Sequence, residues 1–161
     1  MFKLKHIPIP KISMAVIFML IAVNCGKDQN TFLPYVKVNK FIRLANYNHL
    51  TIPGNSVLFQ HEGYKGLIVV CVNPDLGQYY AYDACCPYEE DYSGIVTVQP
   101  VKNLPSPSYE IFSSDFFGIC NKCGSKFNLM ASGQPDSGSS AAHYLQSYNV
   151  SIGMGSLTVS N

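Results

Sequence analysis

The chain has 161 residues, with 47% apolar and 13% charged side chains and a formal net charge of +1. This length favours one domain. The low charge excludes a basic nucleic-acid-binding surface and a long charged disordered tail. Eleven Tyr and nine Phe favour strands, and the shortage of strong helix formers argues against a helical bundle. We therefore expect an all-β protein without a nucleic acid partner.

The first 24 residues have the pattern of a signal peptide. Three lysines precede the apolar run 12–23, which contains no charge and is too short to span a bilayer as a mature helix. The run ends at Cys25 in the sequence Ala-Val-Asn-Cys-Gly, which resembles the processing site of a bacterial lipoprotein. In this interpretation residues 1–24 are removed and Cys25 becomes the lipidated N-terminus. The alternative is a plain secretion signal that is cut nearby, and both interpretations predict export.

Residues 25–45 are expected to form a tether and lead-in, and residues 46–161 the folded domain. The segment 26–31 is polar and would hold the domain away from a membrane surface. With lipid on Cys25, the protein would be a membrane-anchored lipoprotein of the bacterial cell envelope, in the periplasm or at the outer membrane.

Short strands separated by Gly and Pro turns follow the tether. Apolar, β-branched and aromatic residues predict strands over 56–60, 67–72, 78–83, 94–98, 125–130, 146–152 and 156–159. The run 67–72 has no alternation, so we expect both of its faces to be buried. Segments 103–108 and 132–140 are rich in Pro, Gly and Ser and are predicted to be loops. The series predicts an antiparallel β-sandwich or partly open barrel.

Four cysteines fall into two groups that could share one site. Cys85 and Cys86 are adjacent, and Cys120 and Cys123 form a C-x-x-C pair, a spacing that brings two sulfurs to one centre. Neighbouring side chains usually point in different directions, so we do not expect Cys85 and Cys86 to face the same centre. Cys71 lies within an apolar strand and is interpreted as a small buried hydrophobic residue.

The order of these motifs resembles that of Rieske-type iron–sulfur domains. In that family the first loop is Cys-x-His and the second is Cys-x-x-His-Gly-Ser-x-Phe, followed by a Gly-rich third loop. The corresponding segments here are 81–88, 120–127 and 133–138. The resemblance covers residues 50–161 and is closest to a Rieske-like lipoprotein branch that Bacteroidetes-type bacteria export. It implies a Rieske-like fold with two cysteine loops side by side at one tip, and a role in electron transfer.

Two ligand positions depart from the pattern of that family. Cys86 and Cys120 match its cysteine ligands, but Tyr88 and Cys123 stand at its histidine positions. A Rieske centre has two Cys on one iron and two His on the other, so the ordinary centre cannot form from these motif residues. The histidines beyond the signal peptide lie outside the motif and are expected at the surface or in hydrogen bonds: His49, His61 and His143.

The altered site could hold a metal or a disulfide. Cys86, Cys120 and Cys123 would be the metal ligands, with Cys85 or Tyr88 as a fourth group. Thiolates suit a [2Fe–2S] cluster or tetrahedral zinc, whereas export favours a disulfide and no cofactor. A cluster predicts an electron-transfer module with an unknown redox partner, whereas zinc or a disulfide predicts a binding or structural protein. We find no nucleotide loop and no nucleophile elbow, which argues against a stand-alone enzyme.

Overall fold

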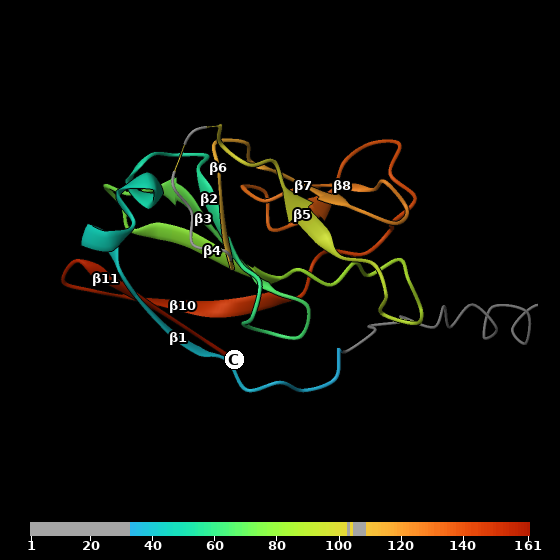
Figure 1. Ribbon diagram of the computed structural model, residues 1–161, viewed down its shortest axis with the longest axis horizontal. Coiled ribbons are helices and arrows are strands. Elements are labelled where there is room, and N and C mark those ends of the chain that lie inside the picture. The colour runs from blue at the N-terminus through green and yellow to red at the C-terminus, as the bar shows by residue number, and fades with distance from the viewer. Residues whose placement is uncertain (1–32, 103, 105–108) are drawn as a thin grey trace, which may run out of the picture. The chain divides into compact units, whose positions relative to one another are not determined.

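The computed structural model describes residues 33–102, 104 and 109–161, which form an antiparallel all-β domain (Figure 1). The all-β prediction is therefore confirmed. The predicted signal peptide and Cys25 lie outside the described residues, as does most of the predicted loop 103–108. Within the described residues, no helix has the length and apolar character needed to cross a membrane.

Seven strands form the larger sheet, in the order β1-β11-β10-β4-β3-β2-β6, and all neighbours are antiparallel. The strands are β1 Asn39–Arg43, β2 Ser56–Phe59, β3 Leu67–Asn73, β4 Gln78–Asp83, β6 Glu110–Ser113, β10 Ser147–Gly153 and β11 Ser156–Ser160. Two short 3-10 helices, η1 Leu44–Asn46 and η2 Asn48–Thr51, follow β1. Strand β1 lies in the segment that we predicted as tether and lead-in, and it joins the sheet by pairing with β11.

Four strands form the smaller sheet, in the order β5-β7-β8-β9. They are β5 Val96–Val98, β7 Phe117–Cys120, β8 Lys126–Asn128 and β9 Gln134–Pro135. Figure 1 shows β5, β7 and β8 grouped beside the larger sheet. Cys120 ends β7 and pairs with Val96 at the start of β5, and Cys85 forms an isolated bridge with Ile95. These pairings bring the two cysteine loops to one end of the smaller sheet.

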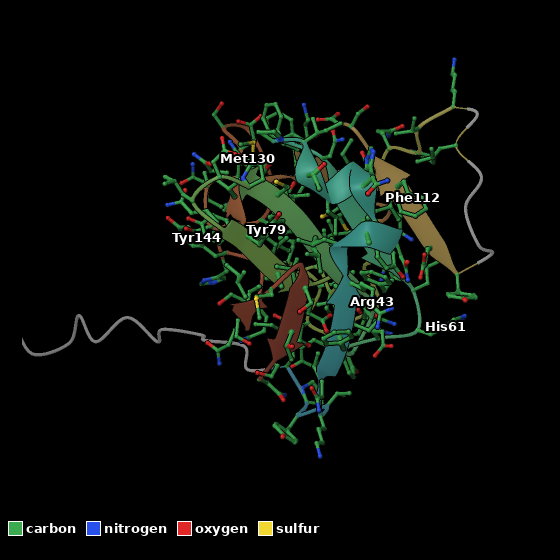
Figure 2. All side chains as sticks on the ribbon, turned by 90° about the vertical axis from the view of Figure 1, so that its left-hand side faces the viewer. Arg43, His61, Tyr79, Phe112, Met130 and Tyr144 are labelled. Carbon is green, nitrogen blue, oxygen red and sulfur yellow. The ribbon has the colours of Figure 1, made fainter. Side chains whose placement is uncertain are left out.

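The middle strands of the larger sheet are buried on both faces, as predicted for 67–72. One face forms a cluster with the smaller sheet, here called the inter-sheet core: Leu58, Ile68, Val70, Tyr82, Val96, Phe127 and Leu129. The other face forms a second cluster, here called the outer core: Ile42, Val57, Phe59, Leu67, Val69, Cys71, Ala81 and Leu157. Tyr79 is part of the outer core and Phe112 packs against it, and both are labelled in Figure 2. The inter-sheet core fixes the strands that carry the cysteine loops.

Candidate metal centre

Three cysteine side chains from two loops meet at the end of the smaller sheet. The sulfur atoms of Cys86, Cys120 and Cys123 all lie within 4.8 Å of one another, and the Cys86 and Cys123 sulfurs are 3.6 Å apart. Cys86 and Cys120 are buried, whereas Cys123 is partly exposed. Among the described residues, no other three His, Cys, Asp or Glu side chains come together in this way. These three residues, predicted as metal ligands from the sequence, are here called the cysteine triad.

Asp83, at the end of β4, fixes the start of the first cysteine loop. Its carboxylate is fully buried and accepts hydrogen bonds from the backbone N–H groups of Tyr64 at 2.6 Å, Lys65 at 3.2 Å and Cys85 at 2.8 Å. The hydroxyl of Tyr148 donates a fourth hydrogen bond at 2.7 Å. These donors compensate the carboxylate for its lost hydration. Asp83, which lies just before the cysteines, thereby connects the end of β4 to the segment at Tyr64 and Lys65 and to Tyr148 of β10.

The sequence analysis did not identify this role of Asp83. The available signal was an acidic residue at the end of a strand whose last residues are otherwise apolar or aromatic, directly before the cysteines. An acid in such a place must find donors once it is buried. Three of its four donors come from distant parts of the chain, so only the structure identifies them.

The second cysteine loop is a tight turn stabilised by its own backbone. The N–H of Cys120 donates to the carbonyl of Ser125 at 2.9 Å, and the N–H of Gly124 donates to the carbonyl of Cys120 at 3.1 Å. Gly124 has a φ of +72°, a conformation that favours glycine. The Ser125 hydroxyl lies 3.2 Å from the Cys123 sulfur and accepts a hydrogen bond from the N–H of Ala141. The turn therefore directs Cys123 toward Cys86 and joins it to the third loop.

Gly94 lets the two loops approach each other closely. A Cβ atom at this position would lie 2.8 Å from Cγ of Glu89, 2.9 Å from Cβ of Cys86 and 3.0 Å from the sulfur of Cys120. Carbon contacts at such distances are repulsive, so a side chain here would force the loops apart. The N–H of Cys86 also donates to the Gly94 carbonyl at 3.0 Å. Sequence reasoning placed Gly94 at the start of a strand and missed this function.

The environments of Cys86 and Cys123 affect their thiols in opposite directions. Burial raises the pKa of Cys86, the neighbouring thiols add to this, and a hydrogen bond from the backbone of Tyr88 opposes it. Desolvation also acts to raise the pKa of Cys123, but hydrogen bonds from the Ser125 hydroxyl and N–H and from the neighbouring thiols outweigh it and lower the pKa. A metal binds thiolates, so its binding must release the proton of Cys86.

Cys85 and Tyr88, the residues predicted as a fourth group, lie outside the triad in different ways. The Cys85 sulfur is 3.9 Å from the carbonyl oxygens of both Cys86 and Tyr92. Burial and the charge of Asp83 raise the pKa of Cys85 to about 12. The side chain of Tyr88 is 51% exposed, and its backbone, rather than its phenol, interacts with Cys86. As expected, the adjacent cysteines point to different surroundings.

The histidines serve other parts of the domain. Nε2 of His49 lies 2.6 Å from the carbonyl oxygen of Ser113, and its Nδ1 lies 3.1 Å from the side-chain nitrogen of Asn55. The ring of His61 lies beside that of Tyr109, and His143 is exposed. These are the surface and hydrogen-bonded positions that the sequence predicted.

Lys122 forms ion pairs between the two cysteine loops. Its Nζ lies 3.6 Å from Oε2 of Glu89 and 3.4 Å from Oδ2 of Asp91, and it also contacts the hydroxyl of Ser93. Exposed ion pairs add little stability. The ion pair with Glu89 matters because of its position. Cγ of Glu89 lies next to Gly94, beside the triad.

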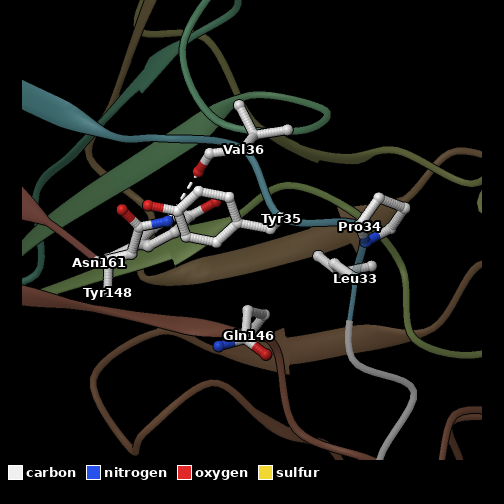
Figure 3. Close-up of a pocket in the computed structure, with 7 residues that line it drawn as sticks. All are labelled: Leu33, Pro34, Tyr35, Val36, Gln146, Tyr148 and Asn161. Carbon is white, nitrogen blue, oxygen red and sulfur yellow. Dashed lines mark hydrogen bonds between the residues drawn. The ribbon is translucent and has the colours of Figure 1, made fainter.

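A surface pocket of about 280 Å³ lies beside the lead-in (Figure 3). It is lined by Leu33, Pro34, Tyr35, Val36, Gln146, Tyr148 and Asn161. The side-chain nitrogen of Asn161 donates to the carbonyl of Val36 at 2.7 Å and holds the lead-in against the end of the sheet. None of the triad cysteines lines this pocket, so the candidate site remains the triad.

The chain was compared with known proteins. No protein-family model and no curated protein matches it. Among solved structures, it is similar to a chain from the complex of reduced oxygenase and oxidized ferredoxin in carbazole 1,9a-dioxygenase. The identity is 18%, the match covers 78% of this chain and 94% of that chain, and the TM-score is 0.45. Similarity at this level carries no argument about family or function, which must rest on the motifs and the site.

The donor atoms and their spacing fit a soft metal. Thiolates bind zinc and iron, and a Zn–S bond of about 2.3 Å places neighbouring corners of a tetrahedron about 3.8 Å apart. The Cys86–Cys123 separation of 3.6 Å agrees with that edge. A [2Fe–2S] cluster has the same donor types but divides four ligands between two irons.

Proposed function

We propose that this protein is an electron-transfer module with a Rieske-like fold, in which the cysteine triad holds an iron centre. The observation that carries the proposal is the convergence of three thiols from the two loops whose motifs resemble those of Rieske domains. An iron–sulfur centre would supply one-electron transfer. The partly exposed Cys123 gives such a centre a short path to the surface, where a redox protein could dock.

The surrounding residues would tune the centre through charge and hydrogen bonds. The backbone of Tyr88 donates toward the Cys86 sulfur, and Ser125 donates toward Cys123. Such hydrogen bonds stabilise thiolate charge and are known to set the potentials of iron–sulfur sites. Thiolate in place of a neutral imidazole adds negative charge, so we expect a potential nearer to that of all-cysteine ferredoxins, about −400 mV, than to the Rieske range.

We further propose that lipid on Cys25 tethers the module to the bacterial envelope. The support is the lysine-led apolar run that ends at this cysteine. Cys25→Ala should release the protein from the membrane fraction or block its maturation, while Cys71→Ala, a change inside the domain, should leave fractionation unchanged. Membrane fractionation of both variants that matches the wild type would contradict the tether.

A zinc-stapled or disulfide-stapled binding protein is the second candidate. It is favoured by the spacing of the triad, because three sulfurs within 4.8 Å of one another can occupy three corners around one ion. The 3.6 Å between Cys86 and Cys123 also leaves only a small movement for a disulfide. In both cases the staple would join the two loops and carry no electrons.

Anaerobic purification followed by metal analysis and visible absorption tests the proposal. We expect a coloured protein that contains iron, and loss of colour in Cys86→Ser and Cys120→Ser. Cys71→Ala is the control, because Cys71 belongs to the outer core. Colourless protein with one zinc per chain would support the zinc staple instead. Colourless protein without metal, carrying a bond between the loops, would support the disulfide.

A further inference from the structure

The cysteine triad supplies three ligands, whereas a tetrahedral metal takes four. The two groups predicted for the fourth position are poorly placed in this structure. The Cys85 sulfur faces backbone carbonyls, and the Tyr88 side chain is half exposed. The residue that completes the site should instead have a donor atom that is close to the triad and able to reach it by rotation of its side chain.

Glu89 brings its Cγ atom beside two of the triad cysteines, and its carboxylate, which is not grouped with the three sulfurs in this structure, would reach them by rotation of the side chain. A single Cβ-sized volume over Gly94 touches Cγ of Glu89, Cβ of Cys86 and the sulfur of Cys120, so these atoms surround one small space. The side chain of Glu89 is only 16% exposed, whereas that of Asp91, two residues later, is 64% exposed. The backbone turn that joins the N–H of Tyr92 to the carbonyl of Glu89 holds this side chain at the loop interface. Carboxylate oxygen is an accepted ligand of zinc alongside thiolates.

We propose that the Glu89 carboxylate is the fourth ligand of the metal held by the cysteine triad, and that Lys122 competes with the metal for it. This inference rests on the metal site proposed above. Lys122 lies between the two cysteines of the C-x-x-C pair in the sequence, and its Nζ is 3.6 Å from Oε2 of Glu89. When Glu89 turns to the metal, Lys122 keeps Asp91 and Ser93 as partners. Its positive charge then offsets part of the negative charge of three thiolates and a carboxylate.

Cobalt binding under anaerobic conditions tests the assignment with the full domain. Co²⁺ takes the place of zinc in such sites, its sulfur charge-transfer absorption counts the thiolates, and its d–d bands report the coordination number and donor types. For wild type we expect three thiolates and four-coordinate bands. Glu89→Gln should keep the charge-transfer absorption, change the d–d bands, and weaken Co²⁺ binding in competition with a chelator by about tenfold or more.

Asp91→Asn is the matched control. It removes the other carboxylate that pairs with Lys122 but lies at an exposed position, so its cobalt spectrum should equal that of wild type and its affinity should fall far less than that of Glu89→Gln. The unfolding midpoint of each variant shows whether it is folded. Two results would overturn the role of Glu89 while leaving the triad intact: a spectrum and affinity of Glu89→Gln that equal the wild type, or equal weakening in both variants. Failure of the wild type to bind Co²⁺ or Zn²⁺ at all would instead overturn the metal site itself.

Discussion

The larger sheet and the cysteine tip are held together by different forces. In the sheet, apolar side chains fill both faces of β2 and β3, which pack into the inter-sheet core on one side and into the outer core on the other. At the tip, polar and conformational devices dominate: the four hydrogen bonds to Asp83, the hydroxyl of Ser125, the ion pairs of Lys122 and the bare backbone of Gly94.

This difference separates stability from function in the molecule. Apolar burial stabilises a domain in proportion to the area removed from water and does not depend on one geometry of a few atoms. A metal site depends on a few atoms held at defined distances. Changes in the outer core should therefore alter the free energy of unfolding without altering metal binding, and changes at the tip should alter metal binding more than the free energy of unfolding.

The largest expected effect on the fold comes from the outer core. The Phe59 side chain is 1% exposed and packs edge-on against Tyr47, with ring centroids 5.6 Å apart. Phe59→Ala should reduce the free energy of unfolding by about 3–5 kcal/mol, because it leaves a cavity. Denaturant titration measures this loss, and the metal content of the remaining folded protein should equal that of wild type. Loss of metal in proportion to the lost free energy of unfolding would contradict the independence of the two regions.

Asp83 is the point where the two regions meet, so its removal should affect both. Asp83→Ala leaves the N–H groups of Tyr64 and Cys85 and the hydroxyl of Tyr148 without their acceptor. We expect a loss of about 2–3 kcal/mol in the free energy of unfolding, together with weaker metal binding. Asp83→Asn keeps one acceptor oxygen and should lose less of both. Metal binding in Asp83→Ala equal to that of wild type would show that the anchor serves the sheet alone.

Gly94→Ala should act mainly at the tip. The added Cβ would press on Cβ of Cys86 and the sulfur of Cys120. We expect a loss of about 1–2 kcal/mol in the free energy of unfolding and a larger relative loss of bound metal. Gly153→Ala is the control, since its Cβ would meet only the flexible Ser156 hydroxyl in an exposed hairpin. Normal metal content in Gly94→Ala would contradict the close approach of the loops.

Alkaline pH should gradually lower the free energy of unfolding. Burial, aided by a hydrogen bond to Glu110, raises the pKa of Tyr47 from 10.0 to about 12, and burial beside Cys71 raises the pKa of Tyr79 to about 12. The folded state therefore favours the protonated tyrosines. This stabilisation is complete below pH 10 and is lost as the pH rises toward about 12. The free energy of unfolding measured at stepped pH should fall through that window, and less steeply in Tyr47→Phe. A flat profile would contradict the burial of these hydroxyls.

The sequence predicted the strands of the larger sheet where their pattern was strong. The segments 67–72 and 78–83 correspond to β3 and β4, and 156–159 to β11, because continuous apolar runs bounded by turn residues leave few alternatives. Strands β1, β6 and β7 were missed, and β9 falls inside the predicted loop 132–140. These strands are short and gain their hydrogen bonds from distant partners, such as β11 for β1.

The triad was predicted from the sequence, but its supports were not. Cys86, Cys120 and Cys123 could be grouped because cysteine spacing carries information about sites. The contributions of Asp83 and Gly94 depend on contacts with residues such as Tyr148 and Glu89, which a local pattern does not show. The fourth position was assigned to Cys85 or Tyr88 by their place in the motif. The structure directs the Cys85 sulfur to backbone carbonyls and leaves the Tyr88 side chain half exposed.

Native mass spectrometry of the anaerobically purified protein tests the shared site most directly. We predict a mass above that of the bare chain by one metal centre, and loss of that added mass in each of Cys86→Ser, Cys120→Ser and Cys123→Ser but not in Cys71→Ala. Retention of the metal in any one of the three triad variants would contradict a centre that all three thiols share. A wild-type mass equal to that of the bare chain, with all three thiols open to alkylation, would contradict the metal centre altogether.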